Sequence, residues 1–284
     1  MAGKYKSIAV ECHYWKPGTD YITDIIEAIK NMVDDGDFVT VSEKALSTAL
    51  GNLIDEKTLK PSSLAYFIAK YWMPLVWSYI LGPICHLRTR TMEYLRSYPT
   101  EEGSHHKQLA LERGGFMQAL LFGSEGGIDG SNLPYSYVCL PLEDAQKVAQ
   151  ELREQIRSRL GKNVSIVIVD TDKTYSLKSF HFTPRPKPIK GIHSRGGVLA
   201  YVTGRSLKLK KRATPVAVAG SPIATEEAIE LAKIANRTRG SGAGRTVWDM
   251  AETFNVTLTE VTWRMLDSVK HLPVVIIRPK SQMR

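Results

Sequence analysis

The segment EDAQKVAQELREQIRSRLGKNVSIVIVDTD, residues 143–172, gives the strongest indication of the fold. Between Glu143 and Leu160 apolar side chains recur at helical spacing, which predicts an amphipathic helix that ends at Gly161. From Val164 to Val169 the chain is almost entirely β-branched, as in a strand that is buried on both faces. A helix followed at once by a buried strand indicates a fold that mixes helices with sheet.

Helices and strands alternate over the rest of the chain, and several glycine-rich turns separate them. Strands are predicted at residues 7–10, 38–41, 137–140, 216–219 and 273–277. Helices are predicted at 21–33, with Thr19 or Asp20 as the N-cap, and at 225–234 and 258–270. Residues 55–100 are predicted to be helical and aromatic, whereas the polar segment 100–106 is predicted to be a loop.

The composition is that of an ordinary globular protein. Of the 284 residues 43% are hydrophobic and 24% are charged, which excludes general disorder and low-complexity architecture. The length fits one large domain or two modest ones. Three cysteines (Cys12, Cys85 and Cys139) lie far apart, which argues against a disulfide framework or a cysteine-rich zinc module. Together with the lack of a recognisable signal peptide, they predict a cytoplasmic protein.

One apolar segment, Leu64 to Cys85, is long enough to span a membrane. Lys70, Pro74 and the Gly82-Pro83 pair interrupt it, and no comparable segment follows. We therefore expect no membrane association, and predict a pair of buried or interface helices that are broken at the prolines. The aromatic side chains of this segment could also serve a dimer contact.

The formal net charge of +9 comes from one part of the chain. No acidic residue lies between Asp172 and Glu226, and the rest of the chain is close to neutral. A segregated basic segment favours anionic partners such as phosphates, polycarboxylates or nucleic acid, and the alternative is a solvated basic loop. The segment contains eleven cations: Lys173, Lys178, Arg185, Lys187, Lys190, Arg195, Arg205, Lys208, Lys210, Lys211 and Arg212.

Two aspartates are candidate ligands of a divalent ion. Asp129 lies in a glycine-rich turn, Gly127 to Asn132, and Asp170 is expected at the end of the most apolar strand. Carboxylates that adjoin strands in this way can hold Mg²⁺ or Mn²⁺, which prefer oxygen ligands. The alternative is a local structural role, in which Asp129 forms an Asx-turn and Asp170 caps a helix.

Other candidate groups point to phosphate binding. Lys44 follows the predicted strand 38–41 and could contact a nucleotide phosphate. The segment Gly240 to Thr246 resembles a phosphate-cradling loop, although its spacing is not that of a Walker A motif, and it could instead be a flexible linker. The histidines show no metal-ligand spacing, and His105-His106 is expected to be solvated.

Together these segments resemble the coenzyme F420-0:γ-glutamyl ligase family. Residues 35–51 resemble its Asp-Gly-Asp, apolar strand and Thr-Ser-Lys run. Gly127 to Asn132 resembles its Gly-Ile-Asp-x-Ser-Asn motif, and Asp170-Thr171 resembles its Asp-Thr pair. The strand around Ala217 and the closing run from Leu272 to Arg278 resemble its later strands.

The resemblance implies an α+β fold with mixed sheets and flanking helices over residues 1–284. Within it, residues 55–105 would be a divergent helical aromatic insertion and 173–225 a basic segment. Members of that family use GTP and a divalent metal to join L-glutamate to a carboxylate-bearing acceptor through an acyl phosphate, and they form homodimers. The acceptor would be coenzyme F420-0 or another anionic compound.

The resemblance also implies roles for individual residues. Asp129 and Asp170 would ligate Mg²⁺ or Mn²⁺, with Thr171 beside the second ion. The nucleotide would be contacted by a second set: Ser42, Glu43, Lys44 and Asn132. The two aspartates are accordingly expected to converge in the folded chain.

Two departures from the family pattern indicate an altered acceptor pocket. His13 to Pro17 replaces a Gly-Leu-Pro-like segment of the nucleotide site, and Asp172 to Tyr175 stands where the family has Phe-Gly-Arg-Pro. The alternative function is a diverged ligase-like protein that binds nucleotide or nucleic acid through its basic segment.

Overall fold

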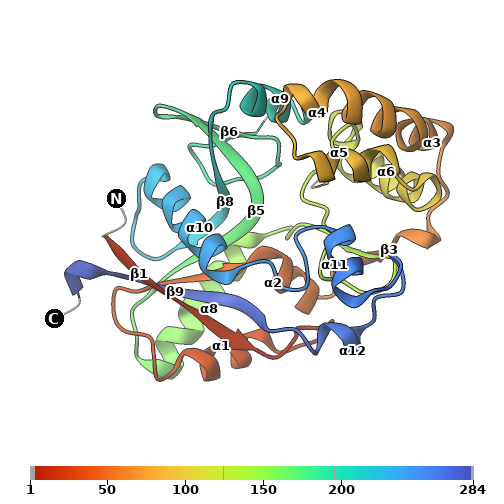
Figure 1. Ribbon diagram of the computed structural model, residues 1–284. Coiled ribbons are helices and arrows are strands. Elements are labelled where there is room, and N and C mark those ends of the chain that lie inside the picture. Colours follow the sequence, from red (N-terminus) through yellow and green to blue (C-terminus); the bar gives the residue numbers. More distant parts are fainter. Residues whose placement is uncertain (1–3, 124, 195, 283–284) are drawn as a thin grey trace.

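A mixed seven-stranded sheet forms the centre of the protein (Figure 1). The computed structural model describes residues 4–123, 125–194 and 196–282. The strand order is β1-β9-β2-β5-β6-β7, and β8 also pairs with β5. The strands are β1 (Tyr5–Cys12), β2 (Phe38–Ser42), β5 (Ser165–Leu177), β6 (Phe180–Thr183), β7 (His193–Ser194), β8 (Lys210–Ala219) and β9 (His271–Pro279). The predicted α+β class with mixed sheets and flanking helices is confirmed.

The centre of the sheet is made by β2 and β5, which run parallel to each other. All five residues of β2 are buried, because β5 and the antiparallel β9 flank it and helices cover both faces. The strand predicted from Val164 to Val169 is present, but the prediction that it ends at Asp170 was wrong. After an irregularity between Asp170 and Lys173, β5 continues to Leu177 and pairs with β6 and β8.

Helices cover the two faces of the sheet. On one face α1 (Tyr21–Ile29), α2 (Glu43–Ala49) and α8 (Ala145–Leu160) enclose a core that includes Leu46, Leu152 and Ile166. On the other face α10 (Thr225–Arg239) packs on β5, β8 and β9 through Leu231 and its neighbours. The predicted caps are present, because the Asp20 side chain accepts a hydrogen bond from Thr23 N and Gly161 has a φ of +68°.

A second group of helices packs beside the sheet (Figure 1, upper right). It contains η1 (Glu56–Thr58), α3 (Ser63–Phe67), η2 (Ile68–Leu81), α4 (Gly82–Ile84), α5 (Thr89–Arg96), α6 (Thr100–Gly114), α7 (Phe116–Ala119) and α9 (Val198–Ser206), with the short ribbon of β3 (Leu53–Asp55) and β4 (Tyr137–Cys139). Trp77, Met73 and Leu109 are among its fully buried residues. We call this group the helical lobe.

Two predictions for the helical lobe were wrong. Residues 100–106 form the first part of α6 and are not a loop. The chain also does not break at Pro74, because η2 is a π-helix that runs through it. A π-helix has wider turns than an α-helix. No helix in the described part of the chain is both long and apolar enough to cross a membrane. The assignment of 55–105 as an insertion and of 173–225 as a separate segment stays a prediction.

The C-terminal region is less helical than predicted. Within 258–270 only α12 (Trp263–Leu266) is helical, and α11 (Val247–Phe254) precedes it. The backbone turns at Asn255 with a φ of +53°, and Val261 is buried without belonging to a helix. The apolar spacing of this segment therefore reflects burial of separate side chains in a small core rather than one long helix.

Candidate active site

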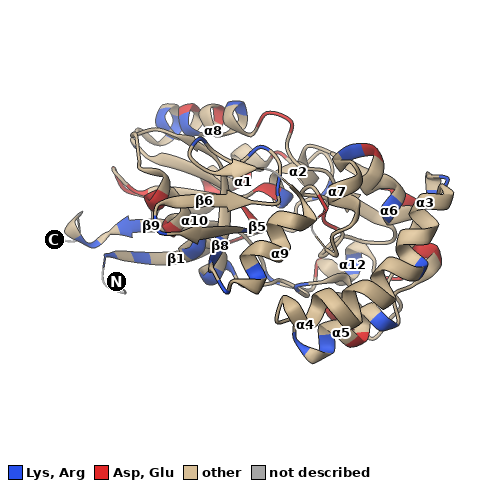
Figure 2. Cartoon of the chain, turned by 90° about the horizontal axis from the view of Figure 1, so that it is seen from above, with Lys and Arg blue, Asp and Glu red and all other residues tan. Residues whose placement is uncertain are grey.

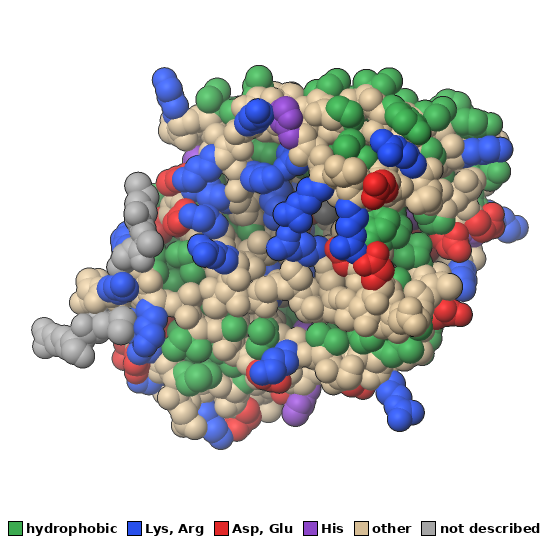
Figure 3. Space-filling view, in the orientation of Figure 1, with side chains coloured by type: hydrophobic (Ala, Val, Ile, Leu, Met, Phe, Trp, Pro, Cys, Tyr) green, Lys and Arg blue, Asp and Glu red, His purple; other side chains and the backbone are tan. Residues whose placement is uncertain are grey.

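A cavity of about 620 Å³ opens where β2, the middle of β5 and the end of α10 meet. Its lining includes six cationic side chains and, among the described residues, no carboxylate. Lys and Arg gather over the middle of this face in the space-filling view (Figure 3). We call the cavity the basic pocket, and its cations are Lys44, Lys173, Arg237, Arg239, Arg245 and Lys270. An arrangement of this kind favours a polyanionic ligand.

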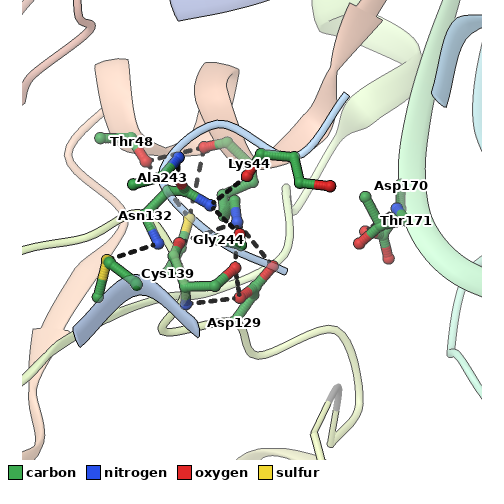
Figure 4. A network of polar contacts seen from close by, with 12 residues as sticks. Lys44, Thr48, Asp129, Asn132, Cys139, Asp170, Thr171, Ala243 and Gly244 are labelled. Carbon is green, nitrogen blue, oxygen red and sulfur yellow. Dashed lines mark hydrogen bonds and ion pairs between the residues drawn. The ribbon is translucent and has the colours of Figure 1, made fainter. Parts of the chain in front are cut away.

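Lys44 connects the helix α2 with the turn that carries Asp129. It lies on the first turn of α2, and its Nζ is 2.9 Å from Asp129 Oδ2 and 2.8 Å from Ser131 Oγ (Figure 4). Burial would raise the pKa of Asp129, but the Lys44 charge and the hydrogen bonds from Lys44 and Ser131 outweigh it, so this pKa is lowered. Asp129 is therefore an ionised group at the side of the basic pocket.

Asp129 also has the local role considered as the alternative. Its Oδ1 accepts hydrogen bonds of 2.8 Å from both the backbone N and the Oγ of Ser131. The bond to the amide two residues later is that of an Asx-turn. The turn fixes the carboxylate and does not prevent a contact with a ligand at Oδ2, where Lys44 now binds.

Asn132 holds the segment Gly240–Thr246, which we call the glycine loop. Its Nδ2 donates to Gly244 O at 2.8 Å, and its Oδ1 accepts from Ala243 N at 2.7 Å. A Cβ at Gly242 would lie only 2.6 Å from Asn132 Oδ1, so the loop needs glycine for this close approach. Asn132 lines the pocket, and its amide is engaged in shaping the pocket wall.

Glu43 and Asp170 meet through a residue that the sequence analysis did not assign to the site. Arg185 donates from Nη2 to Glu43 and from Nε to Asp170, and Glu43 also accepts from Leu142 N at 3.0 Å. Burial and the neighbouring Asp170 charge raise the pKa of Glu43 to about 7, although Arg185 opposes this shift. Glu43 does not line the pocket, and it acts on Asp170 through Arg185.

The position of Arg185 bears on one departure from the family pattern. The family's Phe-Gly-Arg-Pro follows Asp-Thr directly, whereas here the β5–β6 hairpin comes first. From the end of β6 the chain reads Phe182-Thr183-Pro184-Arg185-Pro186, and the guanidinium of Arg185 reaches back to Asp170. Only the folded chain reveals this contact, because fifteen positions separate the two residues.

The two aspartates do not contact each other. Asp170 is held by Arg185 and by the Thr171 amide at 2.6 Å, and Asp129 is held by Lys44. Figure 4 shows Asp170 and Thr171 apart from the group around Lys44 and Asp129. The expected convergence into one cage is therefore not present in this arrangement. The helix-cap interpretation of Asp170 was wrong, since Asp170 lies within β5.

The carboxylate oxygens of Asp129 and Asp170 suit a hard cation, but Lys44 and Arg185 already bind them. Asp129 and Asp170 offer carboxylate oxygens, and the Thr171 hydroxyl lines the pocket. No group of three or more His, Cys, Asp or Glu side chains within the described ranges could hold a metal ion. Mg²⁺ commonly takes only one or two protein carboxylates and completes its shell with water and substrate phosphates. The residues fit such an ion if it displaces Lys44 or Arg185 from a carboxylate.

Arg239 is a site residue that the sequence analysis missed. It is the last residue of α10, half-buried, and it lines the pocket. Among the described residues its side chain has no hydrogen-bond or ion-pair partner. Burial lowers the pKa of Arg239 to about 10 against the effect of the Asp170 and Asp129 charges. A desolvated cation without a bonded partner attracts an anion to the pocket. The signal in the sequence was its place directly before the glycine loop.

An aromatic wall closes one side of the pocket. Tyr14 and Trp15 line it together with His271, whose ring centroid lies 4.7 Å from that of Tyr14. Burial and the charges of Arg239 and Lys44 lower the pKa of His271 to about 3, so this side chain is neutral. Its buried Nε2 has no hydrogen-bond partner in the part of the chain that the structure describes. Tyr14 and Trp15 belong to the segment that departs from the family's Gly-Leu-Pro pattern, and both line the pocket.

The remaining predicted residues have clear positions. Ser42 ends β2, lines the pocket and makes no side-chain hydrogen bond with the described residues. His106 is not solvated as expected: it lies in α6, with Nδ1 2.5 Å from Glu56 and Nε2 3.1 Å from Glu125. It belongs to the helical lobe and not to the basic pocket.

The basic segment does not form one surface. Arg185 and Arg212 are buried in ion pairs, Lys173 lines the pocket, and Arg205 donates to backbone carbonyls. Of the exposed cations of the segment, Lys210 and Lys211 lie on β8 opposite the end of β5, which Lys178 follows, whereas Lys187 and Lys190 lie in the loop after β6. Figure 2 shows Lys and Arg on many elements of the chain. Arg195 lies outside the described residues. The excess charge of the sequence is thus divided between structural ion pairs, the pocket and the surface.

Comparisons with known proteins agree with the motifs quoted above. The sequence model of the F420-0:Gamma-glutamyl ligase family matches residues 9–247. An uncharacterized protein of Methanocaldococcus jannaschii is 35% identical over 98% of both chains. A coenzyme F420:L-glutamate ligase of Methanopyrus kandleri is 27% identical over 55% of each chain. The family match includes all the predicted site residues and Arg239.

Proposed function

The chain belongs to the F420-0:gamma-glutamyl ligase family, and on this premise we propose that it is a ligase that joins L-glutamate to an anionic carboxylate acceptor. The proposed acceptor is coenzyme F420-0 or a related compound. GTP is the proposed phosphoryl donor and Mg²⁺ or Mn²⁺ the proposed metal. The family consists of nucleotide-dependent γ-glutamyl ligases. We propose that this chain retains that activity, and we propose roles for its residues.

One observation carries the proposal: six cations and the glycine loop line a cavity of about 620 Å³ next to the ionised Asp129. Only some of these cations have partners among the described residues, and the phosphates of a nucleoside triphosphate would neutralise the others. The loop amides add further donors for phosphate oxygens. The aromatic wall of Tyr14 and His271 offers a surface on which a base can stack.

The proposed reaction has two steps. An acceptor carboxylate oxygen attacks the γ-phosphorus, which forms an acyl phosphate and releases the nucleoside diphosphate. The free amine of L-glutamate then attacks the acyl carbon, phosphate leaves, and the amine proton is lost to solvent. Catalysis of this kind depends mainly on positioning and on neutralising charge. Lys44 and Arg239 supply fixed positive charge, and Asn132 keeps the glycine loop in place.

One metal ion would be held at Asp129, and a second at Asp170 with Thr171 beside it. When bound, these ions would neutralise phosphate charge during transfer. Glu43 and Arg185 set the position of Asp170 from the buried side. Ser42 offers a free hydroxyl to the nucleotide at the pocket edge.

The direct test is release of phosphate with GTP, Mn²⁺, L-glutamate and coenzyme F420-0. We expect Asp129→Asn and Asp170→Asn to lower kcat by about 100-fold or more, because each removes charge that aligns the phosphoryl group. Glu154→Gln, an exposed change on α8, is the matched control and should leave the rate unchanged. Chelation with EDTA should stop phosphate release and leave nucleotide binding measurable.

The proposal fails if the wild-type protein releases no acceptor-dependent phosphate, or if both aspartate variants keep the full rate and bind Mn²⁺ as the wild type does. If the product contains another amino acid, the protein is still a ligase, but L-glutamate is not its substrate. If the rate with ATP equals the rate with GTP, the enzyme is not specific for GTP.

We also propose a cytoplasmic homodimer. The three thiols are free in the structure, which agrees with a reducing compartment. Light scattering should give twice the chain mass of 31.7 kDa.

The alternative, nucleic-acid binding through residues 173–225, has less support. Several cations of that segment are engaged in buried ion pairs, and the exposed ones are divided between the start of β8 and the loop after β6. A salt titration with RNA and DNA separates the two functions, because phosphate contacts weaken steeply with salt.

A further inference from the structure

An exposed hydrophobic face runs along the helical lobe from α3 through η2 to α4. It lies at the upper edge of the molecule in the space-filling view (Figure 3). We call it the aromatic face. Each of its large side chains is at least 42% exposed, and they are Leu64, Tyr66, Phe67, Tyr71, Leu75, Tyr79, Ile80 and Ile84.

The other side of the same helical segment is already buried. Ile68, Met73 and Trp77 are at most 1% exposed and form the core of the lobe. The exposed members recur about every four or five positions, which agrees with the wide turns of the π-helix η2. A helix that is hydrophobic on all sides needs cover on all sides. Within the described residues the chain covers only one.

Cations accompany the aromatic face, and acids are missing from it. Lys70 Nζ lies 5.4 Å and 5.5 Å from the ring centroids of Tyr66 and Tyr71. The guanidinium of Arg96, on α5, lies 5.0 Å from the ring centroid of Tyr79. No Asp or Glu occurs in residues 57–92. A partner that covers this face must therefore bind both apolar side chains and positive charge.

We propose that the aromatic face docks on the surface of a bilayer that contains anionic lipids. Leu, Ile and Phe side chains enter the boundary between headgroups and acyl chains, and Tyr side chains lie at headgroup depth. Lys70 and Arg96 then contact lipid phosphates. The contact is peripheral, since no helix of the described chain is suited to cross the membrane.

A second copy of the chain and a nucleic acid fit this face less well. A two-fold contact would place the same patch on both sides and bring two copies of Lys70 into it, while the acid nearest in sequence to the aromatic face on its C-terminal side is Glu93 on α5. A nucleic acid offers phosphates but no hydrocarbon for Leu75 and Ile80, which are 54% and 55% exposed.

Vesicle flotation tests the proposal with the full chain. We expect binding to phosphatidylcholine vesicles that contain phosphatidylglycerol, weak binding to pure phosphatidylcholine, and loss of binding at high salt. Leu75→Ser with Ile80→Ser should abolish flotation. Lys70→Gln with Arg96→Gln should lower the partition coefficient about tenfold or more, since each cation near an anionic surface contributes about 1 kcal/mol.

The matched control is Met32→Ser with Lys147→Gln. Both residues are exposed and lie with α1 and α8, on the other side of the molecule from the helical lobe (Figure 1). Circular dichroism shows whether each variant is folded. The proposal is overturned if the wild type does not float with anionic vesicles, or if the Leu75 and Ile80 changes convert a stable dimer into a monomer. The second result would assign the face to another copy of the chain.

Discussion

At the scale of single residues, Arg239 has the most direct predicted effect. Arg239→Ala should weaken nucleotide binding about 10- to 100-fold, because a charge-assisted hydrogen bond contributes about 1.5–3 kcal/mol. Titration calorimetry with a non-hydrolysable nucleotide measures the change. Arg157→Ala, an exposed change on α8, is the control and should bind normally. An unchanged affinity for Arg239→Ala would remove this residue from the phosphate site.

His106 predicts how stability depends on pH. Burial would lower its pKa, but the charges of Glu56 and Glu125 raise it to about 10. A raised folded-state pKa stabilises the protein fully below the ordinary value of about 6.5, and the contribution is lost as the pH rises toward 10. We expect the melting temperature to fall over this range, and His106→Gln to show a smaller fall. Equal slopes in both proteins would contradict the prediction.

Short motifs located part of the site from the sequence. Lys44, Asp129 and Asn132 were singled out; Lys44 and Asn132 line one pocket, and Asp129 binds Lys44 beside it, while their roles stay predictions. Arg185 was not assigned to the site because its partners, Glu43 and Asp170, are far away in the sequence. Arg239 was missed because only the folded chain places it in the pocket lining. His271 escaped for the same reason, since its partners in the aromatic wall come from the N-terminal segment.

At the scale of elements, the β5–β6 hairpin brings Arg185 to two buried carboxylates. Arg185→Met should destabilise the protein by about 3–5 kcal/mol, because it leaves Glu43 and Asp170 without their buried partner. Urea unfolding measures the loss. Adding Glu43→Gln should recover part of it, since a neutral amide needs no cation. If Arg185→Met is as stable as the wild type, Arg185 has no such role.

Helices and strands differed in how well the sequence predicted them. The buried first part of β5 and the helix α8 have strong sequence patterns and both were predicted, although β5 continues past the predicted end at Asp170. The loop assigned to 100–106 failed because polar side chains also occur on helices that pack only one face. The long helix assigned to 258–270 failed because buried residues of a small core mimicked helical spacing.

At the scale of the whole molecule, β5 belongs to both parts of the protein. Its first half, with Ile166 and Ile168, lies in the core under α8, and Tyr175 packs against Tyr201 of the helical lobe. We expect one cooperative unfolding transition. A nucleotide at 100 times its Kd should raise the unfolding free energy by about 2.7 kcal/mol. Hydrogen exchange should then slow in η2 as much as in β2. Protection confined to β2 would mean that the two parts unfold separately.

The close packing around Tyr175 has a mechanical consequence. A Cβ on Gly204 would lie 2.3 Å from the Tyr175 ring, so α9 rests directly on the far end of β5. The irregularity of β5 between Asp170 and Lys173 separates this contact from Asp170, so α9 fixes the second part of β5 and not the carboxylate. A side chain at position 204 would therefore displace the Tyr175 ring and loosen the contact between the sheet and the helical lobe.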